Sequence, residues 1–182
     1  MAKLEHKRIK LDEVARFIEL YHHHSKPLKR HFFAIGATAE VSPYWPPHDF
    51  CLVGVAQVDN CTSAWSRRYD HLELRRLCIA PHAPPNTASF LIGKVTRACW
   101  AMGAEVLVTY TQPYEKGTAL VASGWWIQQR AKMVKYESGR MEGGLMRWVT
   151  ARSVGPDKRD RENTKRIISE TNQWWAENSQ AA

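Results

Sequence analysis

The sequence predicts one mixed α/β domain followed by a helical tail. Size is the first observation, because 182 residues with 44% hydrophobic side chains suffice for one core and not for two large ones. Order is the second, because segments of strand type alternate along the chain with segments of helical periodicity. The third is the stretch 72–126, which predicts a strand, a proline-bounded turn, a helix, a strand and a second helix. We expect a domain over residues 1–150 and a charged tail over 151–182.

The first expected element is a helix that begins near Leu11. Asp12 and Glu13 fall in its first turn, where acidic side chains complement the helix dipole. The helix ends near the histidines that precede Pro27. Its apolar side chains recur at helical spacing: Leu11, Val14, Phe17, Ile18 and Tyr21.

Three strands are expected next. Residues 32–37 and 50–58 are apolar and rich in branched or aromatic side chains, and the turn-forming insert SPYWPPHD lies between them. These two segments predict antiparallel strands joined by a loop. A polar stretch over 59–71 then leads into a third strand over 72–79.

The best helix candidate covers residues 87–102, and Gly103 suits its end. A strand over 105–111 and a short helix over 117–123 follow. One stripe of the long helix holds its apolar side chains: Phe90, Leu91, Val95, Ala98, Cys99 and Met102.

The last segments predict a closing hairpin and a charged helix. Residues 126–136 and 145–150 are the two arms of the hairpin. Beyond Ala151 the run GPDKRDRENTKR predicts a solvated helix, which Trp174 and Trp175 would dock on the body.

Charge and cysteine content limit the class of protein. A net charge of +8 favours polyanionic partners such as nucleic acid or phosphate-rich cofactors, although a merely soluble basic protein fits it too. The four cysteines lack metal-ligand spacing and predict reduced core residues. No stretch approaches eighteen apolar residues, and the N-terminus lacks the apolar run of a signal peptide. We therefore expect a cytoplasmic protein, monomeric or homodimeric, with no membrane partner.

The turn over residues 80–89 is the first candidate binding element. Pro84 and Pro85 stiffen its entry, and polar side chains follow where a helix has its unpaired backbone N–H groups. Such a helix start binds anions unless a side chain caps it, so an ordinary helix capped by Asn86 or Thr87 is the alternative. No GxxxxGK or GxGxxG motif occurs, which argues against nucleotide hydrolysis and dinucleotide binding.

Four runs in this region, ELRRLCI, PPNTASFLIGK, VLVTYT and GTALVASGWW, resemble the acetyltransferase superfamily called GNAT. They resemble more closely the phage DNA-modification proteins of the Mom type and their relatives, which carry a Glu-Leu-x-Arg-Leu strand and a Pro-x-Asn-Ser/Thr-x-Ser turn. The run YHHHSKPLKRHFFAIG is similar to a patch near the N-terminus of those proteins. The resemblance covers residues 20–150 and leaves the tail unmatched.

The GNAT resemblance implies a fold, an activity and a cofactor. The fold is a mixed, mostly antiparallel twisted sheet flanked by helices, with a parallel strand pair splayed at the cofactor site. The activity is N-acyl transfer from acetyl-CoA or a related acyl-CoA, in the host cytoplasm if a phage encodes the protein. The resemblance to GNAT proteins also implies a set of cofactor-binding residues. These are Cys78, Ile79, Pro85, Asn86, Thr87, Ser89 and Tyr114.

Two departures from the common GNAT pattern are visible. The phosphate loop of GNAT proteins is rich in glycine, whereas here no glycine occurs before Gly93, which agrees with the Mom-type group. Many members use a tyrosine to protonate the departing thiolate, and Leu120 is the residue that best matches its position. Tyr110 or Tyr114 would replace that acid, or the thiolate would leave unassisted.

Glu73 is the candidate general base or metal ligand on the third strand. The alternative is a structural carboxylate paired with Arg75, Arg76 or His71. Glu73 and Arg76 are three residues apart, so a regular strand would point them to opposite faces.

Three adjacent histidines follow the first helix. Neighbouring helical residues point about 100 degrees apart, so one or two of them at most face a common site. His22 or His24 would join Glu73 in an acceptor pocket, either in proton transfer or as ligands of a divalent metal such as iron or zinc. Exposed histidines at a helix end are the alternative.

Basic and aromatic side chains are interleaved in the loops, as is typical where phosphates are neutralised and an extruded base is stacked. DNA is therefore the expected macromolecular partner. The candidate nucleic-acid-binding residues are Lys29, Arg30, Trp45, Trp65, Arg67, Arg68 and Arg76.

Three functions remain open at this point. The first is a Mom-type enzyme that modifies a nucleobase amine, adenine in DNA, and protects phage DNA from restriction. The second is an ordinary N-acetyltransferase acting on a protein or small-molecule amine. The third is a basic binding module without catalysis.

Overall fold

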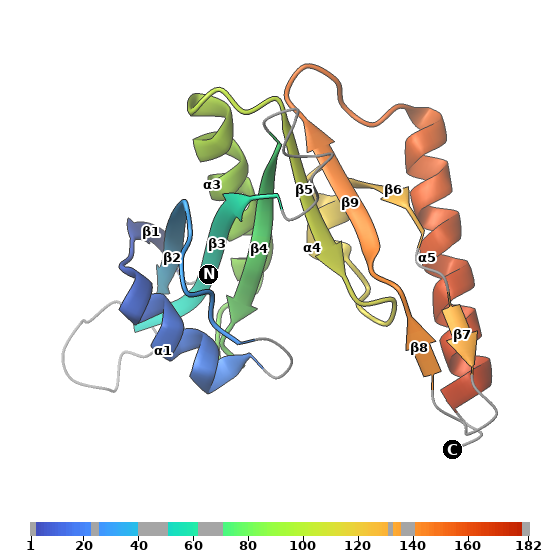
Figure 1. Ribbon diagram of the computed structural model, residues 1–182, viewed down its shortest axis with the longest axis horizontal. Helices are drawn as coiled ribbons and strands as arrows, with labels where there is room; N and C mark the ends of the chain where they lie inside the picture. The colour runs from blue at the N-terminus through green and yellow to red at the C-terminus, as the bar shows by residue number, and fades with distance from the viewer. Residues whose placement is uncertain are drawn as a thin grey trace. The chain divides into compact units, whose positions relative to one another are not determined.

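The computed structural model describes residues 3–22, 26–39, 51–61, 71–130, 133–135 and 141–179 (Figure 1). The chain divides into two compact units, Met1–Leu107 and Val108–Ala182. The predicted domain boundary at residue 151 stays a prediction. Among the described residues, no helix has both the length and the apolar character that a membrane crossing requires.

The first unit contains four antiparallel strands and two helices. In chain order its elements are β1 (Leu4–Arg8), α1 (Leu11–Tyr21), β2 (Phe33–Ala39), β3 (Cys51–Asn60), β4 (Leu72–Ile79) and α3 (Thr87–Ala101). The predicted first helix, the antiparallel pair, the third strand and the long helix are confirmed, with bounds within two residues of the predicted ones where both are given.

β1 was not predicted. It is the edge strand beside β2, and three of its five residues, His6, Lys7 and Arg8, are exposed. An edge strand presents one unpaired side to water, and charged side chains there discourage pairing with another chain. The same charges remove the apolar alternation from which a strand is predicted.

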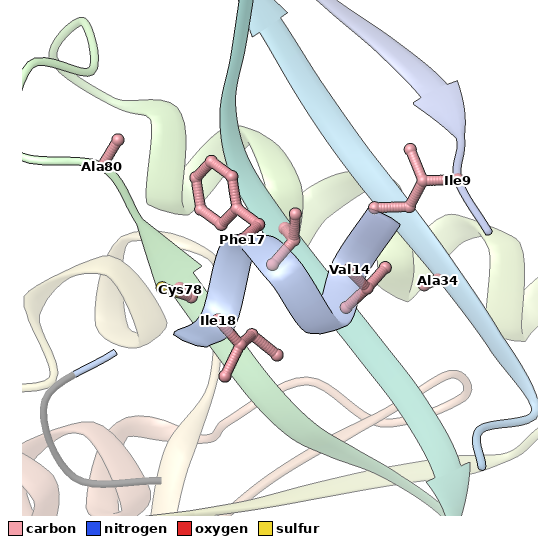
Figure 2. Close-up of a cluster of buried hydrophobic side chains, with 8 residues drawn as sticks. Ile9, Val14, Phe17, Ile18, Ala34, Cys78 and Ala80 are labelled. Carbon is pink, nitrogen blue, oxygen red and sulfur yellow. The ribbon is translucent and has the colours of Figure 1, made fainter. Parts of the chain in front are cut away.

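α1 and α3 cover opposite faces of the strands of this unit (Figure 1). On one face, Val14, Phe17 and Ile18 of α1 pack against Val55 and neighbouring side chains (Figure 2). This α1 core cluster consists of Ile9, Val14, Phe17, Ile18, Ala34, Val55, Cys78 and Ala80.

On the other face, α3 approaches the sheet closely at Gly54. A Cβ atom at Gly54 would lie 2.9 Å from Ile79 Cδ1 and 3.0 Å from Leu91 Cδ1. The glycine therefore sets how closely α3 packs on β3.

The second unit contains β5 (Val106–Thr111, which begins at the boundary), α4 (Thr118–Ala122), β6 (Trp126–Gln129), β7 (Met133–Lys135), β8 (Met141–Gly143), β9 (Met146–Ala151) and α5 (Lys158–Ser179). β6 pairs with β9 as the predicted closing hairpin requires. The arm predicted over 126–136 is not one strand, because β7 leaves this sheet and pairs with β8 instead.

α5 confirms the charged helix predicted for the tail, and it packs on β6. The Ile127 backbone N–H donates to Thr164 Oγ1 at 3.0 Å, and Arg130 forms an ion pair with Glu170 at 2.6 Å. The threonine hydroxyl thus satisfies a backbone donor on a sheet edge, which is one way to protect such an edge.

The described strands follow the order β1-β2-β3-β4-β5-β9-β6, antiparallel apart from the parallel pair β4–β5. This mixed, mostly antiparallel sheet with flanking helices confirms the predicted α/β class. The predicted splay of the parallel pair stays a prediction.

Replacing Ile18 with alanine tests the α1 core cluster. Ile18 is fully buried, so Ile18→Ala removes apolar contacts, leaves a cavity and lowers the free energy of unfolding by about 2–5 kcal/mol. Urea denaturation followed by circular dichroism measures the change. Leu20 of the same helix is 73% exposed, and Leu20→Ala is expected to change stability by less than about 0.5 kcal/mol. Equal losses in both variants would contradict this packing.

Candidate functional site

A β-bulge in the β3–β4 pair brings polar side chains of both strands to one face. Gln57 lies opposite Arg76 and Asp59 opposite Glu73, and the register shift leaves Arg75 as the extra residue. Gln57 and Asp59 are two residues apart and share a face, so the partners opposite them share that face too. The prediction that Glu73 and Arg76 point to opposite faces is therefore wrong, because it assumed a regular strand.

The polar side chains at this bulge are well buried. Gln57 has no exposed surface, Glu73 is 6% exposed and Asp59 is 9% exposed. Arg75 Nη1 lies 3.8 Å from Asp59 Oδ2, and Arg75 Nε lies 3.8 Å from Glu73 Oε1. The positive charge of Arg75 thus offsets the negative charges of both carboxylates, although both distances are longer than a hydrogen bond. Buried charges need such compensation, because an unpaired charge inside a protein is costly.

Lys26 and His31, in the segment that leads from α1 to β2, make direct contact with this group. Arg76 Nε donates to the Lys26 carbonyl at 3.2 Å, and Arg76 Nη1 donates to the Arg75 carbonyl at 2.7 Å. His31 Nδ1 and Gln57 Nε2 lie 3.0 Å apart, at hydrogen-bonding distance. We call Gln57, Asp59, Glu73, Arg75, Arg76 and His31 the bulge cluster.

Burial controls the charge states of two members of the bulge cluster. It lowers the pKa of His31, although the negative charge of Asp59 acts in the opposite direction, so the imidazole is neutral at neutral pH. Burial also lowers the pKa of Arg76, with Arg75 adding to the effect and Glu73 opposing it. Arginine starts from a pKa so high that Arg76 stays charged. Two carboxylates and two guanidiniums therefore face each other with a net charge of zero.

Two atoms of the bulge cluster have unused hydrogen-bonding capacity. Gln57 Oε1 and Arg75 Nε are buried and have no hydrogen-bond partner within the described part of the chain. A buried unpaired polar group costs about 1–3 kcal/mol, so a ligand atom or a water that pairs with it is favoured. The site offers an acceptor and a donor to such a ligand.

The turn between β4 and α3 forms a second candidate element. Asn86 is the N-cap residue of α3 and has left-handed backbone angles, with φ 69°, but its side chain makes no capping hydrogen bond. Thr87 Oγ1 donates to the Pro84 carbonyl at 2.6 Å, and Ser89 Oγ donates to the Asn86 carbonyl at 3.0 Å. Both hydroxyls therefore serve as donors here.

The start of α3 suits an anion, and the alternative of a helix capped by the Asn86 side chain is wrong. No acidic side chain lies in its first turn. The backbone N–H groups of Ala88 and Ser89 precede the first α-type hydrogen bond of the helix, from Phe90 N–H to the Asn86 carbonyl at 2.9 Å. These uncapped donors and the positive end of the helix dipole point at the same place.

The other predicted cofactor residues lie in different environments. Pro85 is exposed beside Asn86, and Ile79 is half-buried at the end of β4. Cys78 is buried in the α1 core cluster, where its thiol is enclosed. In the second unit, Tyr110 is half-buried on β5 and Tyr114 is 45% exposed in the turn before α4. Leu120, which stands where many acetyltransferases have a tyrosine, is buried in α4.

The remaining predicted residues are only partly described. Lys29 and Arg30 are exposed next to His31, and His22 is half-buried at the end of α1, with its backbone N–H donating to the Ile18 carbonyl at 2.8 Å. Within the described ranges no group of three side chains of metal-ligating type comes together. Outside the described residues lie His24, Trp45, Trp65, Arg67 and Arg68.

Sequence reasoning missed Gln57, Asp59 and His31 as site residues. The sequence does contain a pattern that indicates Gln57 and Asp59, because they are two residues apart in the otherwise apolar strand VGVAQVDN. Two polar side chains that share an inward strand face are unusual in a core. Nothing in the local sequence indicates that His31 would reach Gln57.

Comparison with protein-family models finds no match, and comparison with curated proteins finds none either. Solved structures do match. A protein of Acinetobacter baylyi ADP1 assigned as an acetyltransferase has a TM-score of 0.62 and 13% identity, over 88% of this chain and 99% of its own. A Bacillus subtilis acetyltransferase in complex with CoA has a TM-score of 0.54 and 13% identity, over 84% of this chain and 99% of its own.

A third structure, of a Salmonella typhimurium protein assigned as an acetyltransferase and bound to its cofactor acetyl-CoA, has a TM-score of 0.58 and 13% identity. It matches over 81% of this chain and 93% of its own. Identities this low establish similarity of fold and no more. The chain has the fold of the GNAT acetyltransferases, which confirms that part of the sequence resemblance.

Thiol reactivity tests the placement of Cys78. Burial raises its pKa to about 11 and that of Cys99 to about 12, so both thiols stay protonated at pH 8. Cys61 is buried as well, whereas Cys51 is exposed, which corrects the prediction that all four are core residues. We expect a disulfide reagent at pH 8 to modify Cys51 in the native protein, and Cys51→Ser to abolish this fast phase. Rapid native labelling of Cys78, located by peptide mass spectrometry, would contradict its placement.

Proposed function

We propose that this protein is an N-acyltransferase that moves an acyl group from acyl-CoA to an amine. One observation carries the proposal: a buried, charge-compensated bulge cluster lies beside the polar segment 26–31, in a chain with the fold of the GNAT acetyltransferases. Two structures of that fold were solved with CoA or acetyl-CoA bound. A binding module without catalysis has less need of two buried carboxylates.

The start of α3 would hold the phosphates of acyl-CoA. The backbone N–H groups of Ala88 and Ser89 are uncapped, and no acid in the first turn repels an anion. Asn86, shortly before them, has left-handed backbone angles, a conformation found in backbone turns that bind anions. Hydroxyl and amide side chains around them stand where most GNAT sequences have glycines.

The bulge cluster would bind and deprotonate the acceptor amine. Acyl-CoA, when bound, supplies an activated thioester. Glu73 accepts a proton from the amine, and Arg75 Nε lies 3.8 Å from its Oε1. Gln57 Oε1 accepts a hydrogen bond from the amine and orients it. Tyr110 or Tyr114 remains the candidate proton donor to the departing thiolate, and the metal predicted from the histidines has no part in this scheme.

For the acceptor we propose a neutral amine, the exocyclic amino group of a nucleobase such as adenine in DNA. The cluster has no net negative charge to hold an ammonium ion, whereas a nucleobase amine is neutral. The net charge of +8 favours a polyanionic carrier. This proposal agrees with the Mom-type resemblance and with a role in protecting phage DNA from restriction. An amine on a protein or small molecule is the alternative.

Substitution of Ser89 tests the cofactor site. Ser89→Asp places a negative charge in the first turn of α3, which repels the CoA phosphates, and Ser89→Asn is the uncharged control of equal size. We expect CoA affinity, measured by isothermal titration calorimetry, to fall about tenfold or more for Ser89→Asp relative to Ser89→Asn. Stability moves the other way, because an acid at a helix start stabilises by about 0.3–1 kcal/mol. Equal CoA affinities of the two variants would contradict the site.

Nucleoside mass spectrometry tests the reaction and the acceptor. DNA from cells that express the protein is expected to contain a new adenine adduct, and Glu73→Gln is expected to abolish it while CoA binding persists. A panel of amine metabolites and peptides with labelled acetyl-CoA covers the alternative. Unmodified DNA together with acetylated small amines or peptides would overturn the nucleobase acceptor and keep the acyltransferase. Full activity of Glu73→Gln would overturn the role of Glu73.

A further inference from the structure

The outward side of α3 contains a glycine that core packing does not explain. Gly93 lies in the middle of the helix and is half-exposed. A glycine in the middle of a helix destabilises the helix relative to an alanine at the same position, so most helices avoid glycine there. The three side-chain atoms nearest to a Cβ built there all belong to the guanidinium of Arg97, at 3.5 Å for Nη1, 3.7 Å for Nη2 and 3.9 Å for Cζ. Gly93 therefore provides a bare surface over which the Arg97 side chain lies.

Arg97 is directed back along α3. Its guanidinium lies over a residue one turn earlier, as expected from the tilt of helical side chains toward the N-terminus. Arg97 is exposed and has no ion pair or hydrogen bond within the described part of the chain. No acidic residue occurs in α3. The guanidinium is thus an uncompensated cation that points toward the start of the helix.

Ser89, Gly93 and Arg97 follow one another at intervals of four residues, so they form one row along α3. With a rise of 1.5 Å per residue, Gly93 lies about 6 Å along the axis from Ser89. The Arg97 guanidinium is therefore about one helical turn from the uncapped amides. A ligand whose phosphates extend along this row would meet the amides first and the guanidinium next.

Lys94 provides a contrast on the same helix. Its ammonium lies over the Phe90 ring, 5.3 Å from the centroid, and His6 of β1 is on the same ring at 6.4 Å between centroids. Lys94 is therefore engaged on the flank of α3 that faces β1. Lys94 thus has the same positive charge as Arg97, but its side chain points in a different direction.

We propose that Arg97, lying over Gly93, binds the 3′-phosphate on the ribose of CoA and so distinguishes CoA from dephospho-CoA. This inference rests on the proposed function, which puts the pyrophosphate of CoA on the amides of Ala88 and Ser89. CoA carries one further phosphate, a monoester, and a planar guanidinium fork pairs well with its oxygens. The separation of about one helical turn fits two phosphate groups of one ligand.

Calorimetric titration with CoA and with dephospho-CoA tests the proposal. The wild-type protein is expected to bind CoA about tenfold more tightly, the size of one partly exposed charge-assisted contact. Arg97→Met is expected to lose this preference by weakening CoA alone. Lys94→Met, the control for loss of one positive charge on the same helix, is expected to keep it.

Two substitutions of Gly93 provide a second test. Gly93→Leu fills the space under the guanidinium and is expected to reduce the preference for CoA, although a better helix former at this position stabilises the fold. Gly93→Ala adds a Cβ at ordinary contact distance from Arg97 and is expected to keep the preference. Thermal unfolding of each variant verifies that the fold is intact.

The outcomes separate this inference from the proposed function. Equal wild-type affinity for CoA and dephospho-CoA would overturn the role of Arg97 and leave acyl-CoA binding in place. A preference that survives in Arg97→Met would overturn it as well. No binding of either compound would overturn the proposed function itself, and the inference with it.

Discussion

The pairing of β3 with β4 is the constraint on which the candidate site depends. One extra residue, Arg75, turns a regular ladder into a bulge and aligns Glu73 and Arg76 on the face where Gln57 and Asp59 lie. Without the bulge, Glu73 would point to the face of the sheet opposite Arg76. Burying four charges is costly unless they compensate each other, and the bulge places Arg75 within 3.8 Å of both carboxylates. Local backbone irregularity thus makes a polar site possible inside a sheet.

Strand β4 also connects the bulge cluster to the start of α3. β4 starts in the cluster and ends before the turn that leads into α3, so its eight residues join the cluster to the start of α3. Between the cluster and the start of α3, helix α1 packs on one face of the sheet through Val14, Phe17 and Ile18. Glycine has a related role on α3, because Gly54 lets the helix approach the sheet and Gly93 leaves room for Arg97. Strands β3 and β4 therefore hold Gln57, Asp59, Glu73 and Arg75, the buried polar groups of the bulge cluster.

Much of the fold could be predicted from the sequence, because helices and half-buried strands leave a periodic apolar pattern. The third strand and the long helix are examples, since their patterns are strong and proline or glycine bounds them. β1 could not be predicted in this way, because an edge strand with charged side chains lacks the alternation. For the candidate site, the sequence indicated Glu73 and the turn that follows β4, and their roles stay predictions. His31 and Gln57 are 26 residues apart in sequence, and only folding makes them neighbours.

The sequence by itself determined the α/β class, the polar turn before α3 and the presence of Glu73 on β4, because each depends on residues that are close along the chain. Tertiary structure decided that Glu73 lies on the same face of the sheet as Gln57 and Asp59, since a register shift between two strands depends on both partners. It also decided that Cys78 is enclosed under α1 and that Arg97 lies over Gly93, because burial and side-chain direction arise from packing. Chemistry at this site follows from charges that only the folded chain brings within a few ångströms of each other.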